Sequence, residues 1–211
     1  MIGALLAASI VAAPAWAQDA RLEMDGVDYV VPAPAGYCAA GKAIDTYRAQ
    51  GQQAPLSRAI VMFPCDADRP SADAYLISAD LDRDRTTRRA YLASLRPSMA
   101  DPVTSIREVL DTHMHHAFGE QATADGSLFP GDRDDVCGYI LGMEELSIAD
   151  EQIEAVMTAC STVIAGRLVY VIRYRQGSDF DAAVTAKSET RRIALSIVPA
   201  SGATPTPRGP H

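Results

Sequence analysis

The sequence lacks the short motifs by which several large enzyme classes are recognised. It contains no Gly-x-Ser-x-Gly elbow, no His-Glu-x-x-His zinc helix and no glycine-rich phosphate loop. Carboxylate pairs, another common catalytic device, are too plentiful among 27 acidic residues to single one out. Enzyme function is therefore unsupported by the sequence rather than excluded, and no cofactor is implied.

Basic residues are in the minority. The chain has 19 Lys and Arg residues against 27 Asp and Glu residues, a formal net charge of −8 and a pI near 4.9. Nucleic-acid binding depends on basic patches that release counterions from phosphates, and an anionic membrane surface attracts positive charge in the same way. The charge balance argues against nucleic acid and against a membrane surface. The expected partner is instead a protein, or a small anionic ligand bound by the arginines described below.

No apolar run reaches the length of about 20 residues that a bilayer-spanning helix needs. The apolar run nearest to it lies within residues 1–17, which carry no charge and end in the small-residue pattern Ala15-Trp16-Ala17. This pattern predicts a secretory signal peptide cleaved after Ala17, although a basic n-region is missing. No cysteine directly follows the cleavage site for lipid attachment. We therefore expect a soluble chain exported to the periplasm, with an extracellular end point left open, and no membrane insertion after cleavage.

The remaining residues predict one α+β domain over 18–200 and a disordered Pro-rich tail over 201–211. Asp25-Gly26 and Ala165-Gly166 suit tight hairpin turns, whereas residues 119–135, rich in Gly, Asp and Pro, predict an exposed loop. Strands are expected over 21–24, 27–31, 58–63, 74–81, 136–146, 152–164 and 167–175. The fold class is a mostly antiparallel sheet, with a C-terminal β-meander and helices packed on it.

Helices are predicted over residues 41–52, between the strand that ends at residue 81 and Asp101, from Asp101, and from Ser178. The helix from Asp101 has an apolar stripe at helical spacing, namely Val103, Ile106, Leu110, Met114 and Ala117. The helix from Ser178 has Asp181 three residues later as a capping-box partner. Its inward side chains are expected to be Phe180, Val184, Ala194 and Ile197.

Four cysteines in an exported chain suggest two disulfide bonds. Two of them, Cys137 and Cys160, stand opposite each other in a hairpin if its turn is centred between residues 148 and 149, where the sequence has a polar break. Spacing therefore predicts Cys137–Cys160 and, by elimination, Cys38–Cys65. No two cysteines are close in sequence, which favours structural bridges over redox or zinc chemistry.

The register of the meander separates an apolar face from a polar one. The cysteine hairpin sets Tyr139 against Thr158, and the turn at Ala165-Gly166 sets Thr158 against Arg173. The core face carries Val136, Ile140, Met157, Ala159, Val163, Leu168, Tyr170, Ile172 and Tyr174. The other face is a candidate binding surface for a carboxylate ligand or an acidic partner, because arginine offers a bidentate fork. Its residues are Tyr139, Thr158, Thr162, Arg173 and Arg175, and the wet side of an antiparallel sheet is the simpler interpretation.

Histidine chemistry is concentrated in one helical segment. At about 100° per residue, His113, His116 and Glu120 fall in one narrow sector, while His115 points nearly opposite. Those three side chains are candidate metal ligands. An ordinary half-exposed helix face is the alternative interpretation, since neither a further ligand nor a second shell is evident.

The order of elements resembles the PsbP-like fold. An N-terminal hairpin enters the segment VVPAPAGY from Val30 to Tyr37, a late strand hairpin follows, and the closing helix ends in IALSIV from Ile193 to Val198. The chain is also similar to small exported proteins of alphaproteobacteria with a Pro-x-Gly-Tyr/Phe-Cys start. The resemblance implies a sandwich-like scaffold for assembly without a shared catalytic site, so it assigns no functional residue.

These features predict an exported interaction or ligand-binding module that is not an enzyme. One alternative is an inhibitor or immunity-type protein whose acidic surface occupies a basic partner. The other is a metal-binding protein or metal-dependent enzyme that uses the helix face of His113, His116 and Glu120.

Overall fold

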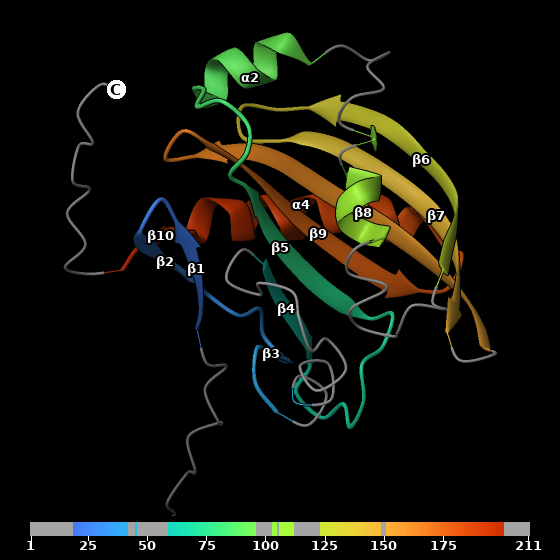
Figure 1. Cartoon of the computed structure of the whole chain (residues 1–211). Helices are drawn as coiled ribbons and strands as arrows, with labels where there is room; N and C mark the ends of the chain where they lie inside the picture. The colour runs from blue at the N-terminus through green and yellow to red at the C-terminus, as the bar shows by residue number, and fades with distance from the viewer. Residues whose placement is uncertain are drawn as a thin grey trace, which may run out of the picture.

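The computed structural model in Figure 1 describes residues 19–41, 45, 59–95, 103–104, 106–111, 123–148 and 151–200. Its strands are β1 (Ala20–Met24), β2 (Val27–Val31), β3 (Tyr37–Cys38), β4 (Ala59–Pro64), β5 (Ala74–Asp80), β6 (Thr123–Arg133), β7 (Gly138–Ile148), β8 (Glu151–Ile164), β9 (Arg167–Gln176) and β10 (Val198–Pro199). The helices with described bounds are α2 (Arg88–Ser94) and α4 (Phe180–Ser196), and residues 106–111 are also helical. The predicted signal peptide 1–17, the tail 201–211 and almost all of the predicted helix 41–52 lie outside the described residues.

These strands form two antiparallel sheets. The large sheet has the order β3-β4-β5-β9-β8-β7-β6, and β1, β2 and β10 form a small one. Figure 1 shows long, curved outer strands, with α4 running across one face of the large sheet. The α+β class, the antiparallel pairing and the C-terminal meander β7-β8-β9 are those that the sequence predicts.

Tight turns set two of the hairpins. Asp25 and Gly26 have φ angles of 55° and 79°, and Ala165 and Gly166 have 52° and 86°. Positive φ at both central residues is what a type I′ turn requires, and this turn matches the right-handed twist of the strands that it joins. The pairing of β8 with β9, including Thr158 opposite Arg173, is the predicted one.

The hairpin of β7 and β8 is shifted by two residues from the predicted register. Tyr139 pairs with Cys160 and not with Thr158, because the turn lies one position later along the chain than predicted. An even shift leaves the strand side chains on their predicted faces. The cysteine pairing is unaffected, since Cys137 lies just before β7 begins and reaches Cys160 diagonally.

Both predicted disulfide bonds are present. Cys38–Cys65 and Cys137–Cys160 have Cα–Cα distances of 5.0 and 5.1 Å and sequence separations of 27 and 23 residues. In the chain-entropy model, closing a loop of this size stabilises the fold by roughly 3 kcal/mol. The first bridge ties β3 to the end of β4, and the second ties the start of β7 to the middle of β8.

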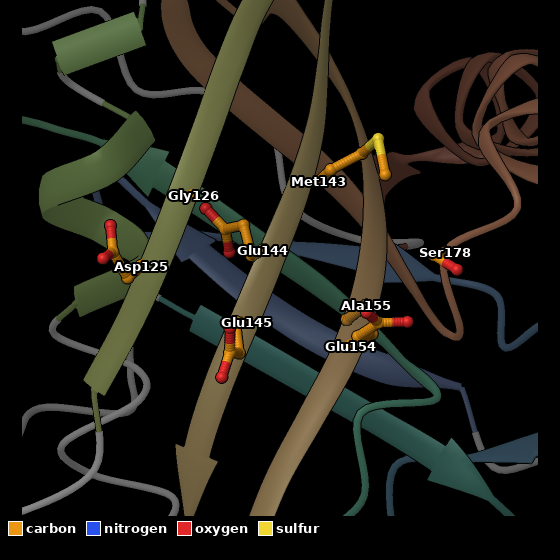
Figure 2. Close-up of a pocket in the computed structure, with 8 residues that line it drawn as sticks. All are labelled: Asp125, Gly126, Met143, Glu144, Glu145, Glu154, Ala155 and Ser178. Atoms are coloured by element: carbon orange, nitrogen blue, oxygen red, sulfur yellow. The ribbon is translucent and has the colours of Figure 1, made fainter.

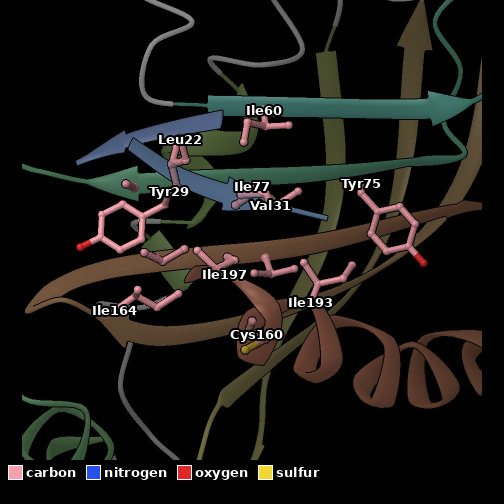
Figure 3. Packing of buried hydrophobic residues seen from close by; sticks show 14 of the residues in the cluster. Leu22, Tyr29, Val31, Ile60, Tyr75, Ile77, Cys160, Ile164, Ile193 and Ile197 are labelled. Atoms are coloured by element: carbon pink, nitrogen blue, oxygen red, sulfur yellow. The ribbon is translucent and has the colours of Figure 1, made fainter. Parts of the chain in front are cut away.

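The central strands of the large sheet are buried on both faces, whereas the sequence predicts one solvated face. Figure 3 shows one core, where the hairpin β1-β2 and α4 pack on the sheet, with Leu22, Ile77 and Ile193 among its members. The opposite face packs against α2 and the helical segment 106–111. Ile106 and Leu110, two members of the predicted stripe, are 0% and 1% exposed there.

The N-cap of α4 lies one residue later than the predicted Ser178, and the helix buries a different stripe. Its N-cap is Asp179, whose side chain accepts from the N–H of Asp181. Ala194 and Ile197 are buried as predicted, but Phe180 and Val184 are 39% and 46% exposed. The buried stripe consists mainly of small side chains, which let the helix lie close to the sheet, namely Ala183, Ala186, Thr190, Ile193 and Ala194.

Strand β6 replaces the exposed loop that the sequence predicts over residues 119–135. It pairs with β7 and has a register shift between Pro130 and Arg133. An edge strand tolerates proline because one row of its N–H groups faces solvent. Most of its described side chains are exposed on both faces, so no alternating apolar pattern marks it in the sequence.

The side chain of Asp25 ties the first hairpin to the large sheet. Its two oxygens accept from Nη2 and Nε of Arg167 at 2.7 and 2.8 Å, and Oδ2 also accepts from Arg85 at 2.7 Å. The hydrogen bond from Arg167 lowers the pKa of Asp25 most, against a smaller rise from burial. The type I′ turn thus presents a carboxylate to the arginine that begins β9.

Asp25→Asn should keep the positive φ, which asparagine tolerates, and remove the charge. We expect a loss on the order of 1–3 kcal/mol in the free energy of unfolding at neutral pH, because Arg167 loses its charged partner. Since the pKa of Asp25 is lowered on folding, this loss is present above the ordinary value of 3.8 and vanishes as the pH falls through the folded-state pKa. Urea unfolding at several pH values measures it.

The matched control is Asp28→Asn. Asp28 pairs with Arg21 in the same hairpin, but the two side chains are 48% and 67% exposed. The control should change the free energy of unfolding by less than about 0.5 kcal/mol. Equal losses in the two variants would contradict the anchoring role of Asp25.

Candidate functional site

The polar face predicted on the meander lies beneath other parts of the protein. Tyr139, Thr158, Thr162 and Arg173 are each less than a tenth exposed, and Arg175 has a third of its side chain exposed. The threonine hydroxyls donate to main-chain carbonyls at 2.5 and 2.6 Å. The structure brings these residues onto one face, as predicted, but the expectation of an open surface there is wrong. The physical reason is α4, whose small side chains allow it to cover the meander.

The hydroxyl of Tyr139 belongs to an anchor for α4. It donates to Oδ2 of Asp134 at 2.8 Å, and the same oxygen accepts from Arg191 of α4 at 3.0 Å. The other oxygen of Asp134 accepts from the N–H groups of Val136 and Cys137, each at 2.7 Å. Burial raises the pKa of Asp134, but these hydrogen bonds outweigh it and hold the pKa below 3.8. The aspartate therefore serves the fold.

Arg173 is the centre of a second internal network. Its guanidinium carbon lies 4.9 and 4.5 Å from the ring centroids of Tyr37 and Tyr75, and its Nη2 donates to the Tyr37 hydroxyl at 2.6 Å. The same nitrogen is 2.5 Å from Asp73, and Nε is 3.6 Å from Glu189 of α4. The charge of Arg173 is thus matched within the protein. This arginine joins β3, β5, β9 and α4.

Arg173→Ala should lower the free energy of unfolding by about 1–3 kcal/mol, because it removes a buried guanidinium that holds the partly exposed carboxylates of Asp73 and Glu189. Arg173→Lys should retain only part of the stability lost in Arg173→Ala, since an ammonium group lacks the planar fork of the guanidinium. Arg175→Ala is the control, because its one ion pair with Glu189 is partly exposed and should be worth about 1 kcal/mol or less. Thermal and urea unfolding measure all three. A fully stable Arg173→Ala variant would return this face to consideration as a ligand site.

Glu144 on β7 is a buried carboxyl that sequence reasoning missed. Its side chain has no exposed surface, and its Oε2 accepts from the hydroxyl of Tyr174 at 3.0 Å. Its Oε1 is 3.6 Å from Arg107, too far for a hydrogen bond, and has no hydrogen-bond partner in the described part of the chain. Burial raises the pKa of Glu144, although Tyr174 and Arg107 lower it. The sequence held one signal of its burial: Glu144 lies two residues before Leu146, and residues two apart on a strand face the same side of the sheet.

Glu144→Gln should change how stability depends on pH. Because the folded-state pKa of Glu144 lies above the ordinary 4.5, its stabilising contribution is complete below 4.5 and is lost as the pH rises through the folded-state pKa. The amide keeps an acceptor for Tyr174 and does not titrate. We therefore expect variant and native protein to converge near about pH 4, and the variant to gain relative stability toward about pH 8.

Urea unfolding across this pH range measures the difference. Glu23→Gln is the control, since Glu23 is an exposed carboxylate in the N-terminal hairpin and its loss should change the pH profile less than Glu144→Gln does. Superimposable profiles for native protein and Glu144→Gln would show that the buried carboxyl is not perturbed.

An open acidic surface lies on the outer strands, as Figure 2 shows. The register sets Asp125 of β6 opposite Glu145 of β7, and Glu145 opposite Glu154 of β8. All three side chains are exposed, and no basic side chain in the described residues forms an ion pair with them. With Met143 and Ser178 they line a pocket of about 310 Å³, beside the segment that leads into α4.

Repulsion makes this carboxylate row unusual. Like charges directly opposite on neighbouring strands destabilise a sheet. Strands lie about 4.8 Å apart, so the row extends over roughly 10 Å, which is wide for a single metal ion. Among the described residues, no group of three or more His, Cys, Asp or Glu side chains is arranged to hold a metal. The arrangement suits several positive charges spread along a ligand.

Exposed apolar side chains accompany the row. Phe129 of β6 and Met143 of β7 are 48% and 40% exposed, and alternation along the strands puts them on the same side of the sheet as the carboxylates. This surface, referred to below as the outer face, consists of Asp125, Phe129, Met143, Glu145 and Glu154. Sequence reasoning missed it because residues 119–135 were expected to be a loop.

His113, His116 and Glu120 lie outside the described residues, so the metal-site prediction stays a prediction. Within the described residues, no helix combines the length and the apolar character that crossing a membrane requires.

No family model matches this sequence, and no curated protein matches it either. Two similar solved structures are the cyanobacterial PsbP of Synechocystis sp. PCC 6803 and the Ran-binding protein Mog1p of Saccharomyces cerevisiae. The first has 13% identity and a TM-score of 0.40, covering 94% of this chain and 100% of that chain. The second has 10% identity and a TM-score of 0.37, covering 85% and 89%. PsbP also has the fold that the order of elements in the sequence resembles.

Proposed function

We propose that this chain is an exported, non-catalytic binding module that contacts its partner through the outer face. The observation that carries the proposal is the carboxylate row of Asp125, Glu145 and Glu154 beside exposed Met143. Arg173, on the same side of the sheet, is by contrast engaged internally by Asp73 and Tyr37. An acidic and partly apolar surface to which the described part of the chain supplies no cation is suited to an external partner.

Export to the periplasm is part of the proposal. Disulfide bonds persist in oxidising compartments, and all four cysteines of this chain are paired. The uncharged apolar segment at residues 1–17, with its small-residue ending, supports the same destination.

The fold makes the outer face rigid before any partner arrives. The bridge Cys137–Cys160 joins β7 to β8, and Lys187 of α4 reaches Asp132 of β6 at 2.7 Å. Gly126 contributes as well, because a Cβ there would lie 2.2 Å from the main-chain oxygen of Met143. Glycine thus permits close packing of β6 on β7. A preorganised surface loses little conformational entropy on binding.

A photo-crosslinking amino acid in place of Met143 should yield a discrete adduct when the full chain is expressed in cells of its source organism. Met143 is exposed at the centre of the outer face, so a bound partner lies within reach. The same amino acid in place of Leu195 is the control, because Leu195 is 49% exposed near the far end of α4. Mass spectrometry identifies the adducts. Adducts at both positions, or at neither, would contradict the proposal.

A further inference from the structure

We infer that the outer face takes an extended segment of a partner protein that carries Lys or Arg at alternate positions. This inference rests on the proposed function and adds the chemistry of the partner. The basic side chains lie on one side of such a segment. Their charged ends would meet the carboxylate row, and their apolar stems would lie against Met143.

The charges of β6 provide the first argument. Asp132, near one end of the strand, pairs with Lys187 of α4, and the adjoining Asp135 pairs with Arg191. Asp125, near the other end, lies beyond the reach of these cations and stands beside Glu145 instead. Among the described residues, α4 therefore supplies cations to the carboxylates at one end of the outer strands and none to those at the other end. A partner's cations would relieve the repulsion there.

The spacing of the row provides the second argument. Three carboxylates on adjacent strands extend over roughly 10 Å. Alternate residues of an extended peptide lie on one side at intervals of about 6.8 Å, so two basic residues separated by one other residue can serve the whole row. Arginine would bind a carboxylate through two hydrogen bonds, and lysine would bind as a point charge.

The apolar side chains provide the third argument. Met143 lines the same pocket as Asp125, Glu145 and Glu154, and Phe129 is exposed further along β6. The stems of lysine and arginine are themselves apolar and can lie against a methionine while their charged ends reach the carboxylates. Methionine is also adaptable in shape, which suits it to contact surfaces. A small inorganic cation would use the charges and leave these side chains uncovered.

A fluorescently labelled Lys-Leu-Lys-Leu-Lys peptide, titrated into the full mature protein and followed by anisotropy, tests this inference. We expect saturable binding that weakens as salt increases. The double variant Glu145→Gln/Glu154→Gln should bind about tenfold more weakly or worse, which corresponds to about 1.4 kcal/mol. Its urea unfolding should show at least native stability, because it removes a repulsion between neighbouring strands.

The matched control is the double variant Asp19→Asn/Glu23→Gln. It also removes two negative charges, but at exposed positions in the N-terminal hairpin region, away from the outer face. Its affinity for the peptide should stay within about twofold of native. Equal weakening in both double variants would overturn the inference, since only net charge would then matter.

Three further comparisons complete the test. Met143→Ser should weaken binding of the Lys-Leu peptide and leave binding of Mg²⁺ unchanged, because the ion has no apolar stem; equal effects on both would overturn the apolar part. A Glu-Leu-Glu-Leu-Glu peptide that bound as well as the basic one would overturn the charge part. If crosslinks from position 143 appear but the basic peptide does not bind, the inference fails and the proposed function stands. If neither the crosslinks nor peptide binding is observed, both the inference and the proposed function are contradicted.

Discussion

The close packing of α4 across the meander is the constraint on which the rest of the structure depends. Ala183, Ala186 and Thr190 are at most 1% exposed, and Thr158 of β8 donates to the main-chain oxygen of Ala183 at 2.5 Å. Larger side chains on this stripe would hold the helix away from the sheet and leave such hydrogen bonds unmade. Because the helix lies so close, polar groups of β7, β8 and β9 that would otherwise face water become internal. Burial then requires that they be paired.

This requirement explains the uneven distribution of charge. The guanidinium of Arg173 is enclosed by two tyrosine rings and acidic partners, and Asp134 accepts four hydrogen bonds from main chain and side chains. Glu144 on the opposite face is less completely matched, and burial accordingly raises its pKa. At the outer end of the sheet, Asp125, Glu145 and Glu154 remain open to solvent. The polar groups beneath α4 are therefore paired inside the protein, whereas the carboxylates of the outer face stay exposed to solvent.

Particular residues show why some predictions succeeded. Asp25-Gly26 and Ala165-Gly166 determine their hairpins because positive φ is a property of a few residues next to one another. Spacing predicted the pairing of Cys137 with Cys160 even though the register was wrong by two, since a disulfide reaches diagonal as well as directly opposite positions. Phe180 and Val184 were misplaced because a helical pattern ranks apolar residues by size, whereas here small residues define the buried stripe. Strand β6 was missed because an edge strand with exposed side chains lacks an alternating pattern.

The sequence by itself determined two of the hairpins, the two bridges and the separation of the meander into two faces. Each of these depends on residue types at short spacing or on the strict alternation of side chains along a strand. Only the tertiary structure decided which face is covered and by what, because the covering elements come from distant parts of the chain. Alternation placed Arg173 and Glu145 on the same side of the sheet, but Arg173 is 4% exposed, beneath Tyr37, Tyr75 and Glu189 of α4, whereas Glu145 is exposed. Because only Arg173 is covered, it belongs to the interior, whereas Glu145 belongs to a surface suited to a partner.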